Sequence, residues 1–151
     1  MGKREEPGAT PDNIKRAVKS LDILASLPEV DGKRLCAYGN SMGAFVTIRL
    51  AAEAPERLKA AAFTAGGVPY YGATEEMAAK VRTPFCILQG SNDNATRPER
   101  SAAFKEILDK NKVPNERHLF EGVAHGLHQE KAAECYKLMK AWFEKHGVLN
   151  P

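Results

Sequence analysis

Hydrophobic and polar positions along the chain form two kinds of pattern, a long helical one near the start and several short apolar runs after it. Between Thr10 and Pro28, apolar residues recur at helical spacing among charged ones, and they are Ile14, Ala17, Val18, Leu21, Leu24 and Leu27. This spacing predicts an amphipathic helix with one apolar stripe. Thr10 can cap that helix, Pro11 suits its first turn, and Pro28 ends it.

Three short apolar runs, at residues 34–38, 59–65 and 85–89, and an alternating segment at 116–120 predict four strands. The alanine-rich run 59–65 also suits a helix by propensity, and its place in the pattern assigns it to a strand. Helical segments follow the runs, at residues 42–54, at 74–80, after the capping-box sequence Thr96-Arg97-Pro98-Glu99, and at the end of the chain. The third has the inner residues Ala103, Phe104, Ile107 and Leu108, and the closing helix carries Ala132, Cys135, Tyr136, Met139, Trp142 and Phe143 on one side. Strands that alternate with helices predict an α/β fold with a parallel sheet and right-handed crossovers.

The length and composition of the chain limit the class of protein to which it can belong. With 151 residues, 43% of them hydrophobic, it can build one core, so we expect a single domain at residues 10–151 after a flexible tail at 1–9. The 22 basic and 19 acidic residues are interspersed, which indicates solvated faces and no nucleic-acid partner. No apolar run has the length of a membrane span, and the first residues lack the apolar middle of a secretory signal. We therefore expect no membrane association and a cytoplasmic location.

The three cysteines, Cys36, Cys86 and Cys135, lie in apolar stretches and have no motif spacing. An odd number of cysteines in this setting predicts reduced thiols in the core. His118, His125 and Cys135 also lack the spacing of metal ligands, so we expect no metal and no cofactor.

The sequence Gly39-Asn40-Ser41-Met42-Gly43 joins the first apolar run to a helix of small residues. A strand that reverses sharply into a helix holds its central residue in a strained conformation, so Ser41 is presented above the sheet beside the first helical N–H groups. We expect Gly39 and Gly43 to be required because a Cβ at either position would crowd the opposite limb of the turn. A serine between two such glycines also occurs in ordinary loops, so the context of the motif decides its meaning.

Two further polar residues follow strand ends in the way that Ser41 does. Asp93 comes after the third predicted strand and His125 after the fourth. The carboxyl ends of parallel strands meet at one edge of a sheet, so this edge would receive a serine, a carboxylate and an imidazole in the chain order of one known form of the catalytic triad. Histidine suits the base because its ordinary pKa lies near 6.5, and a buried carboxylate would fix its tautomer.

Each of these residues also has a simpler interpretation. Asp93 alone would suit a turn or a helix cap, and His125 would suit a loop without chemistry. The other histidines are weaker candidates, since His118 lies within a predicted strand, His128 lies beyond the loop and His146 ends the last helix. Three suitable residues at three suitable strand ends favour the triad over coincidence.

With these motifs, nearly the whole chain from about Asp12 onward resembles the α/β-hydrolase superfamily, and within it the serine-nucleophile relatives of the dienelactone hydrolase family. The resemblance lies in residues 27–31, 39–43, 90–93, 98–101 and 118–126. It implies an esterase without a cofactor, with Ser41 as nucleophile, Asp93 as acid and His125 as base. Dienelactone hydrolase itself has a cysteine at the nucleophile position, so its lactone substrate does not carry over to Ser41.

The resemblance covers only the last four strands and the preceding helix of a fold that has roughly eight strands. It implies a minimal α/β-hydrolase fold without the N-terminal half, in which the N–H of Met42 is one oxyanion donor. The second donor belongs to a loop that follows an early strand, and the sequence lacks that strand. The strand at 34–38 would then be an open apolar edge. We expect a homodimer that covers this edge, the alternative being a marginally stable monomer.

The predicted function is a serine carboxylesterase acting on small esters with short acyl chains, or on lactones. Met42, Gly66, Gly67, Tyr70 and Tyr71 are the candidates for oxyanion and substrate binding, although tyrosines more often serve packing. Peptidase, thioesterase and acyltransferase activities use the same triad, and the absence of a lid favours the esterase. A second hypothesis, from another class, is a non-catalytic or weakly active shortened hydrolase that serves as a binding or assembly module.

Overall fold

The computed structural model describes residues 8–150, and its centre is a sheet of four parallel strands in the order β1-β2-β3-β4. The strands are β1 (Cys36–Asn40), β2 (Ala60–Thr64), β3 (Phe85–Gly90) and β4 (Asn115–Phe120). Each pairs with the next along the chain, so every connection is a crossover that carries a helix. The α/β class with four parallel strands is confirmed, and the alanine-rich run does form a strand.

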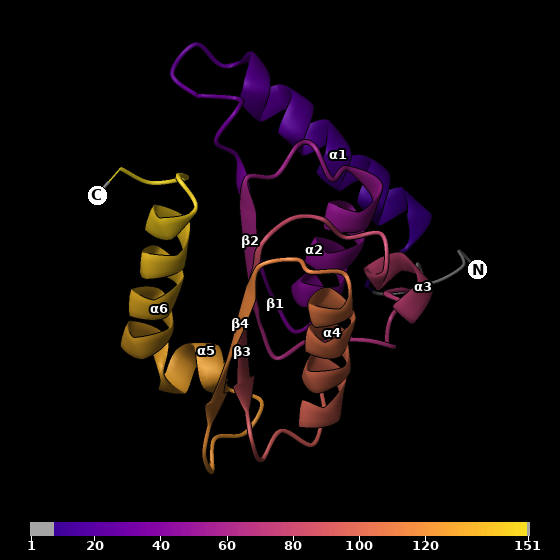
Figure 1. The fold of residues 1–151 in the computed structure, drawn as a ribbon, viewed down its shortest axis with the longest axis vertical. Helices are drawn as coiled ribbons and strands as arrows, with labels where there is room; N and C mark the ends of the chain where they lie inside the picture. The colour runs from indigo at the N-terminus through magenta and orange to yellow at the C-terminus, as the bar shows by residue number, and fades with distance from the viewer. Residues whose placement is uncertain (1–7, 151) are drawn as a thin grey trace, which may run out of the picture.

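Helices cover both faces of the sheet (Figure 1). The helices are α1 (Pro11–Ser26), α2 (Met42–Glu53), α3 (Glu75–Ala78), α4 (Pro98–Lys110), α5 (Leu127–Glu130) and α6 (Ala132–Lys145). Helices α1 to α4 lie on one side of the sheet, while α5 and α6 lie on the other. Alternating strand residues supply the two cores: Phe63 and Ile87 face the larger helical layer, whereas Ala62 and Leu88 face α6.

The first predicted helix is present, and only part of its apolar stripe is buried. The Thr10 side chain accepts a hydrogen bond from the Asn13 N–H, as expected of a cap. Ile14 and Leu21 are buried, but Leu24 and Leu27 are more than 40% exposed. The second half of α1 therefore carries apolar side chains that meet no core.

Three predictions about individual side chains are wrong. The capping box fails because α4 begins at Pro98 with Arg97 as its cap, while Thr96 is buried and donates its N–H to Asp93. The face predicted for the closing helix is too broad, since Tyr136 is 65% exposed and Ala132 is also exposed. All three cysteines are free, but Cys36 is exposed because β1 is an edge strand.

The tail predicted at residues 1–9 falls mostly outside the described residues. Where the two overlap, at Gly8 and Ala9, the prediction is wrong. Ala9 is fully buried, and its N–H donates to the Tyr71 carbonyl at 2.8 Å. The backbone here pairs with the segment after β2, so the packed part of the chain begins before α1.

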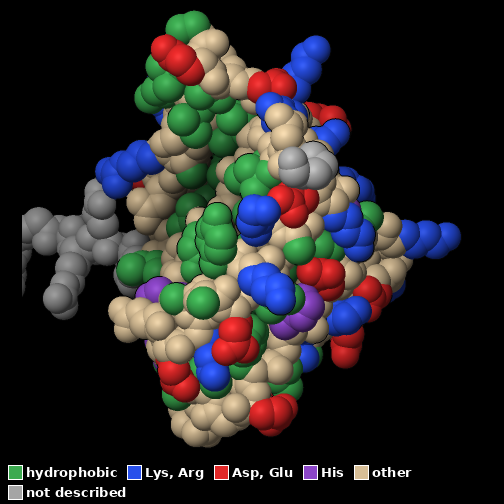
Figure 2. Space-filling model, turned by 90° about the vertical axis from the view of Figure 1, so that its left-hand side faces the viewer, with side chains coloured by type: hydrophobic (Ala, Val, Ile, Leu, Met, Phe, Trp, Pro, Cys, Tyr) green, Lys and Arg blue, Asp and Glu red, His purple; other side chains and the backbone are tan. Residues whose placement is uncertain are grey.

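One edge of the sheet is formed by β1, whose only paired neighbour among the described strands is β2, and the other edge is formed by β4. Tyr38 shares its register position with Ala62, so both lie on the α6 side of the sheet. Ala62 is fully buried there, whereas Tyr38 is 46% exposed. In the view onto this side, hydrophobic side chains line a hollow beside the body of the molecule (Figure 2). Helix α6 thus covers the middle of the sheet and leaves β1 open.

None of the helices that the structure describes combines the length and the apolar character needed to cross a membrane.

Candidate active site

Ser41 occupies the turn between β1 and α2, in a backbone conformation that side chains rarely adopt. Its φ and ψ are 52° and −112°, and its N–H donates to the Thr64 carbonyl of β2 at 2.9 Å. The strain that the sequence predicts at this turn is therefore present, and a hydrogen bond to the neighbouring strand holds it in place. Thr64 also donates from Oγ1 to Asn40 Oδ1 at 2.7 Å and bonds the Tyr38 hydroxyl at 2.9 Å, which ties the end of β1 to β2.

The two glycines beside Ser41 have different roles. A Cβ on Gly39 would lie 2.1 Å from the Gly43 carbonyl oxygen, so the close approach of strand and helix requires glycine at position 39. A Cβ on Gly43 would meet nothing within 4 Å. The prediction that both glycines are sterically required is therefore right for Gly39 and wrong for Gly43, because only the Gly39 Cα faces the opposite limb.

The structure brings Ser41, His125 and Asp93 together at the carboxyl edge of the sheet. Ser41 Oγ lies 2.8 Å from His125 Nε2, and His125 Nδ1 lies 2.9 Å from Asp93 Oδ2 and 3.1 Å from Asp93 Oδ1. A carboxylate can only accept, so the Nδ1 of His125 carries the proton and donates it to Asp93. Nε2 of the neutral imidazole is then the acceptor for the Ser41 hydroxyl.

The loop after β3 prepares Asp93 for this contact. Its side chain is fully buried, and Oδ1 accepts the N–H groups of Ala95 and Thr96 at 2.9 and 2.8 Å. The His125 side chain is 38% exposed. A buried carboxylate that holds a partly exposed imidazole leaves the reacting side of the histidine accessible, which suits a proton carrier.

Gln89 is a residue of this site that the sequence analysis did not identify. It is fully buried at the end of β3, and its Nε2 lies 3.3 Å from Asp93 Oδ2 and 3.0 Å from the Thr96 carbonyl. The amide therefore bonds both the carboxylate and the loop that carries it. The available signal was a polar residue closing an otherwise apolar strand, four positions before the acid.

The five predicted pocket residues lie around α2 and α4. Met42 is the first residue of α2, where a helix has N–H groups without intrahelical partners, and it is 47% exposed. Gly66 and Gly67 are packing positions, because their added Cβ atoms would lie 2.3 Å from the Ala44 side chain and 2.2 Å from the Arg100 backbone. Contact of any of the five with a substrate stays a prediction.

Tyr70 and Tyr71 form an aromatic cluster with Phe45 of α2. Their ring centroids lie 5.5 and 5.6 Å from that of Phe45 and 4.2 Å from each other. The Arg100 guanidinium lies 3.7 Å from the centroid of the Tyr70 ring. These contacts attach the segment after β2 to α2 and α4, so the two tyrosines have a packing role whether or not they touch a substrate.

A single group of described side chains has the composition of a metal site, and it is not part of this constellation. Cys86, Glu116 and His118 bring their ligand atoms within 4.8 Å of one another on the face of the sheet beneath α6. From the sequence we expected no metal because His118, His125 and Cys135 lack ligand spacing, and Cys86 and Glu116 were not considered as ligands.

The chain combines a parallel sheet with a strained serine at a strand-to-helix turn, and an aspartate and a histidine follow at later strand ends. This combination defines the class of α/β hydrolases. A family model then narrows this class to one family. The model of the dienelactone hydrolase family matches residues 1–146, and the chain belongs to this family. The comparison with curated protein sequences finds no match.

Solved structures of α/β hydrolases share the fold at low sequence identity. Porphyromonas gingivalis dipeptidyl peptidase 4 has a TM-score of 0.74 and 15% identity, over 86% of this chain and 22% of that one. A Mycobacterium tuberculosis puromycin-hydrolyzing peptidase has a TM-score of 0.74 and 24% identity, over 89% of this chain and 25% of that one. An α/β hydrolase enzyme from the metagenome of lagoon sediments at Mar Chica, Morocco, has a TM-score of 0.73 and 19% identity, over 89% of this chain and 69% of that one. The chain thus spans about a quarter or less of the two peptidases.

Proposed function

We propose that the chain is a serine hydrolase of the carboxylesterase type, acting on small esters with short acyl chains, or on lactones, through an acyl-enzyme intermediate. The observation that carries this proposal is the continuous hydrogen-bonded path from Ser41 through His125 to Asp93, with steps of 2.8 and 2.9 Å. Membership of the dienelactone hydrolase family supports hydrolysis as the reaction class.

In the first half of the reaction, Ser41 Oγ attacks the carbonyl carbon of the ester while His125 Nε2 takes the hydroxyl proton. Asp93 stabilises the resulting imidazolium and stays ionised. The N–H of Met42, at the start of α2, donates to the oxyanion that forms on the carbonyl oxygen. His125 then gives the proton to the departing alkoxide, which leaves as the alcohol and yields the acyl-enzyme.

In the second half, His125 takes a proton from a water molecule that attacks the acyl carbon. The tetrahedral intermediate collapses, the Ser41–acyl bond breaks, and the proton returns from His125 to Ser41 Oγ. The acid is released and the resting hydrogen bonds are restored. Each proton that leaves the serine or the water thus has one carrier, His125 Nε2.

Short acyl chains are the preferred substrates in this proposal because little of the chain stands over the site. The segment between β2 and β3 holds one four-residue helix, α3, and it packs beside α2 and α4. The rings of Tyr70 and Tyr71 in this segment pack against Phe45 of α2. The proposed substrates are small molecules in the cytoplasm.

A second copy of the chain is the proposed partner, bound along the exposed strand β1. Tyr38 is 46% exposed and Cys36 is exposed on this strand, and both would be covered by an isologous interface. Such an interface would also protect the unpaired backbone groups of the sheet edge.

Turnover of a short-chain nitrophenyl ester by the native chain and by Ser41→Ala tests the function. We expect at least a thousandfold lower kcat in the variant, in line with the loss of a triad nucleophile. Equal rates in the two proteins would end the proposal. Because two of the similar structures are peptidases, an aminoacyl nitroanilide is assayed in parallel, and a preference for it would replace the esterase with a peptidase on the same triad.

The alternative is a weakly active or non-catalytic module. The proposal names one oxyanion donor, the Met42 N–H, and removing one donor from such a site costs about 3–4 kcal/mol of transition-state stabilisation. Ser41 labelling without ester turnover would indicate this alternative, since it separates an activated serine from an assembled active site.

A further inference from the structure

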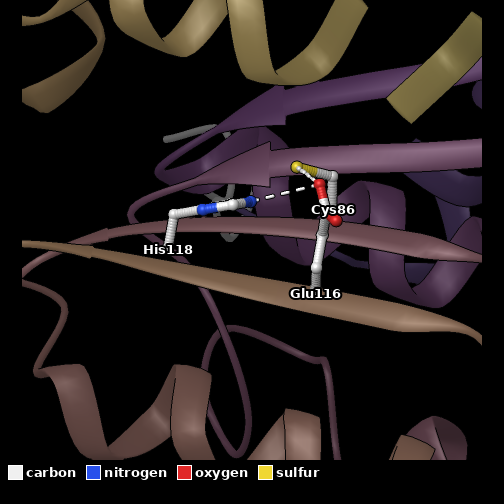
Figure 3. A group of neighbouring side chains, drawn as sticks. All are labelled: Cys86, Glu116 and His118. Atoms are coloured by element: carbon white, nitrogen blue, oxygen red, sulfur yellow. Dashed lines mark hydrogen bonds and ion pairs between the residues drawn. The ribbon is translucent and has the colours of Figure 1, made fainter. Parts of the chain in front are cut away.

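Three side chains with metal-binding chemistry meet on the face of the sheet beneath α6. Cys86 comes from β3, and Glu116 and His118 come from β4 (Figure 3). The strand register explains their meeting. Cys86 pairs with Glu116, and His118 lies two residues further along β4, so all three side chains point to the same face.

The distances among the ligand atoms are close to those of a coordination sphere. Cys86 Sγ lies 3.8 Å from Glu116 Oε1, and His118 Nε2 lies 3.1 Å from the same oxygen. Adjacent ligands in a tetrahedral zinc site lie about 3.3–3.8 Å apart, given metal–ligand bonds of about 2.0–2.3 Å. Small side-chain rotations would therefore place all three atoms around one ion.

The protein alone leaves this group poorly satisfied. Cys86 is fully buried, and its partner in the group is the Glu116 carboxylate. The His118 Nε2 atom is shielded from solvent and makes no well-directed hydrogen bond to any described residue, despite its short distance to Glu116. A ring nitrogen and a sulfur both lie close to one carboxylate oxygen, and a cation among the three atoms would satisfy all of them.

We propose that Cys86, Glu116 and His118 bind a divalent transition metal ion, with Zn²⁺ as the ion that the ligand set fits best. Thiolate, imidazole and carboxylate are the three ligand types of protein zinc sites. The thiol proton passes to solvent on binding, and the charges of thiolate and carboxylate then balance the ion. The Glu116 and His118 side chains are 34% and 32% exposed, so two of the three proposed ligands belong to side chains that solvent partly reaches.

This site is independent of the proposed esterase reaction. Its ligands lie within β3 and β4 under α6, whereas His125 belongs to the loop beyond β4. An ion bound there joins two neighbouring strands directly, so it stabilises the folded chain by mass action and takes no part in ester hydrolysis.

Titration of the untagged full chain with Co²⁺ tests the proposal, because cobalt occupies zinc sites and a thiolate ligand gives it a charge-transfer absorption in the near ultraviolet. We expect one Co²⁺ per chain with this absorption, displaced by Zn²⁺. Cys86→Ser should abolish the band, and Glu116→Gln and His118→Gln should each weaken binding at least tenfold. Added Zn²⁺ should raise the melting temperature of the native chain and leave the melting temperature of His118→Gln unchanged.

Two variants are matched controls. Cys36→Ser removes the exposed thiol and His128→Gln removes a histidine outside the group, and neither should change the affinity more than twofold. Absence of the thiolate band in the native chain, its persistence in Cys86→Ser, or its loss in Cys36→Ser would each overturn the proposal. If Cys86→Ser does not fold, the partly exposed Glu116 and His118 decide the outcome, and unchanged cobalt affinity in both variants would refute the site.

Discussion

Gln89 donates a hydrogen bond from Nε2 to Oδ2 of Asp93, the same oxygen that lies 2.9 Å from His125 Nδ1. One buried amide thus shares a carboxylate oxygen with the imidazole. The same nitrogen also donates to the Thr96 carbonyl, so it fixes the loop that supplies Asp93 with its two backbone donors. Gln89 is therefore a positioning residue for the triad.

Replacement of Gln89 by Met should reduce ester turnover without changing the strand. A buried hydrogen bond to a charged group contributes about 1–3 kcal/mol, which corresponds to roughly a 5- to 150-fold lower kcat. The exposed Gln129→Met is the matched control and should leave kcat unchanged. A Gln89→Met enzyme with native kcat and a native pH profile would show that Asp93 needs no such support.

The two glycines of the elbow should respond oppositely to alanine. Gly39→Ala forces a Cβ against the Gly43 carbonyl oxygen, and we expect a loss of about 3 kcal/mol or more in the free energy of unfolding. Gly43→Ala adds a methyl group in open space within a helix, so it should be neutral or stabilising by up to about 1 kcal/mol. Urea denaturation of both variants checks this, and equal effects would mean that the turn differs from the one described.

The exposed edge strand should make the chain dimeric. Light scattering at micromolar concentration should give the mass of two 16.5 kDa chains. Tyr38→Glu places a charge on β1 and should yield monomers, while Tyr136→Glu, at a more exposed tyrosine on α6, should not. A well-folded native chain with the mass of one copy would refute the dimer.

Stability should decline as the pH falls through the range of histidine titration. Burial lowers the pKa of His146, with Lys145 and Lys59 acting in the same direction and Glu116 against it. The unfolded chain, with a histidine pKa of about 6.5, then binds more protons than the folded chain, so the free energy of unfolding falls as the pH drops from 7.5 through the lowered pKa. Urea denaturation in the presence of a chelator should show a smaller decline in His146→Gln. An equal decline in both proteins would exclude His146 as its source.

Much of this fold could be predicted because the local sequence patterns agree with the tertiary structure. Strands β2 and β3 are buried on both faces, so their sequences are apolar except at their ends, and Pro28 ends the apolar stripe near the end of α1. Failures occur where tertiary contacts override a local pattern. Thr96 has the residue type and spacing of a cap, yet Asp93 takes its N–H and the helix begins at Pro98.

The part of the candidate site that could be predicted consists of the residues that directly follow strands. Ser41, Asp93 and His125 follow three strands, so parallel topology alone brings them to one edge. Gln89 could not be found in this way because its contacts depend on how the loop after β3 folds. The group of Cys86, Glu116 and His118 could not be found because its meeting depends on which residues of β3 and β4 are in register. Sequence spacing carries no record of that register.

Covalent labelling of Ser41 by a fluorophosphonate tests the central claim most directly, because only a serine activated by His125 and Asp93 reacts readily. We expect one adduct per native chain, located at Ser41 by mass spectrometry, with labelling at least a hundredfold slower in His125→Gln and unaffected in His128→Gln. A native chain that stays unlabelled, or a His125→Gln variant that labels at the native rate, would contradict an active triad.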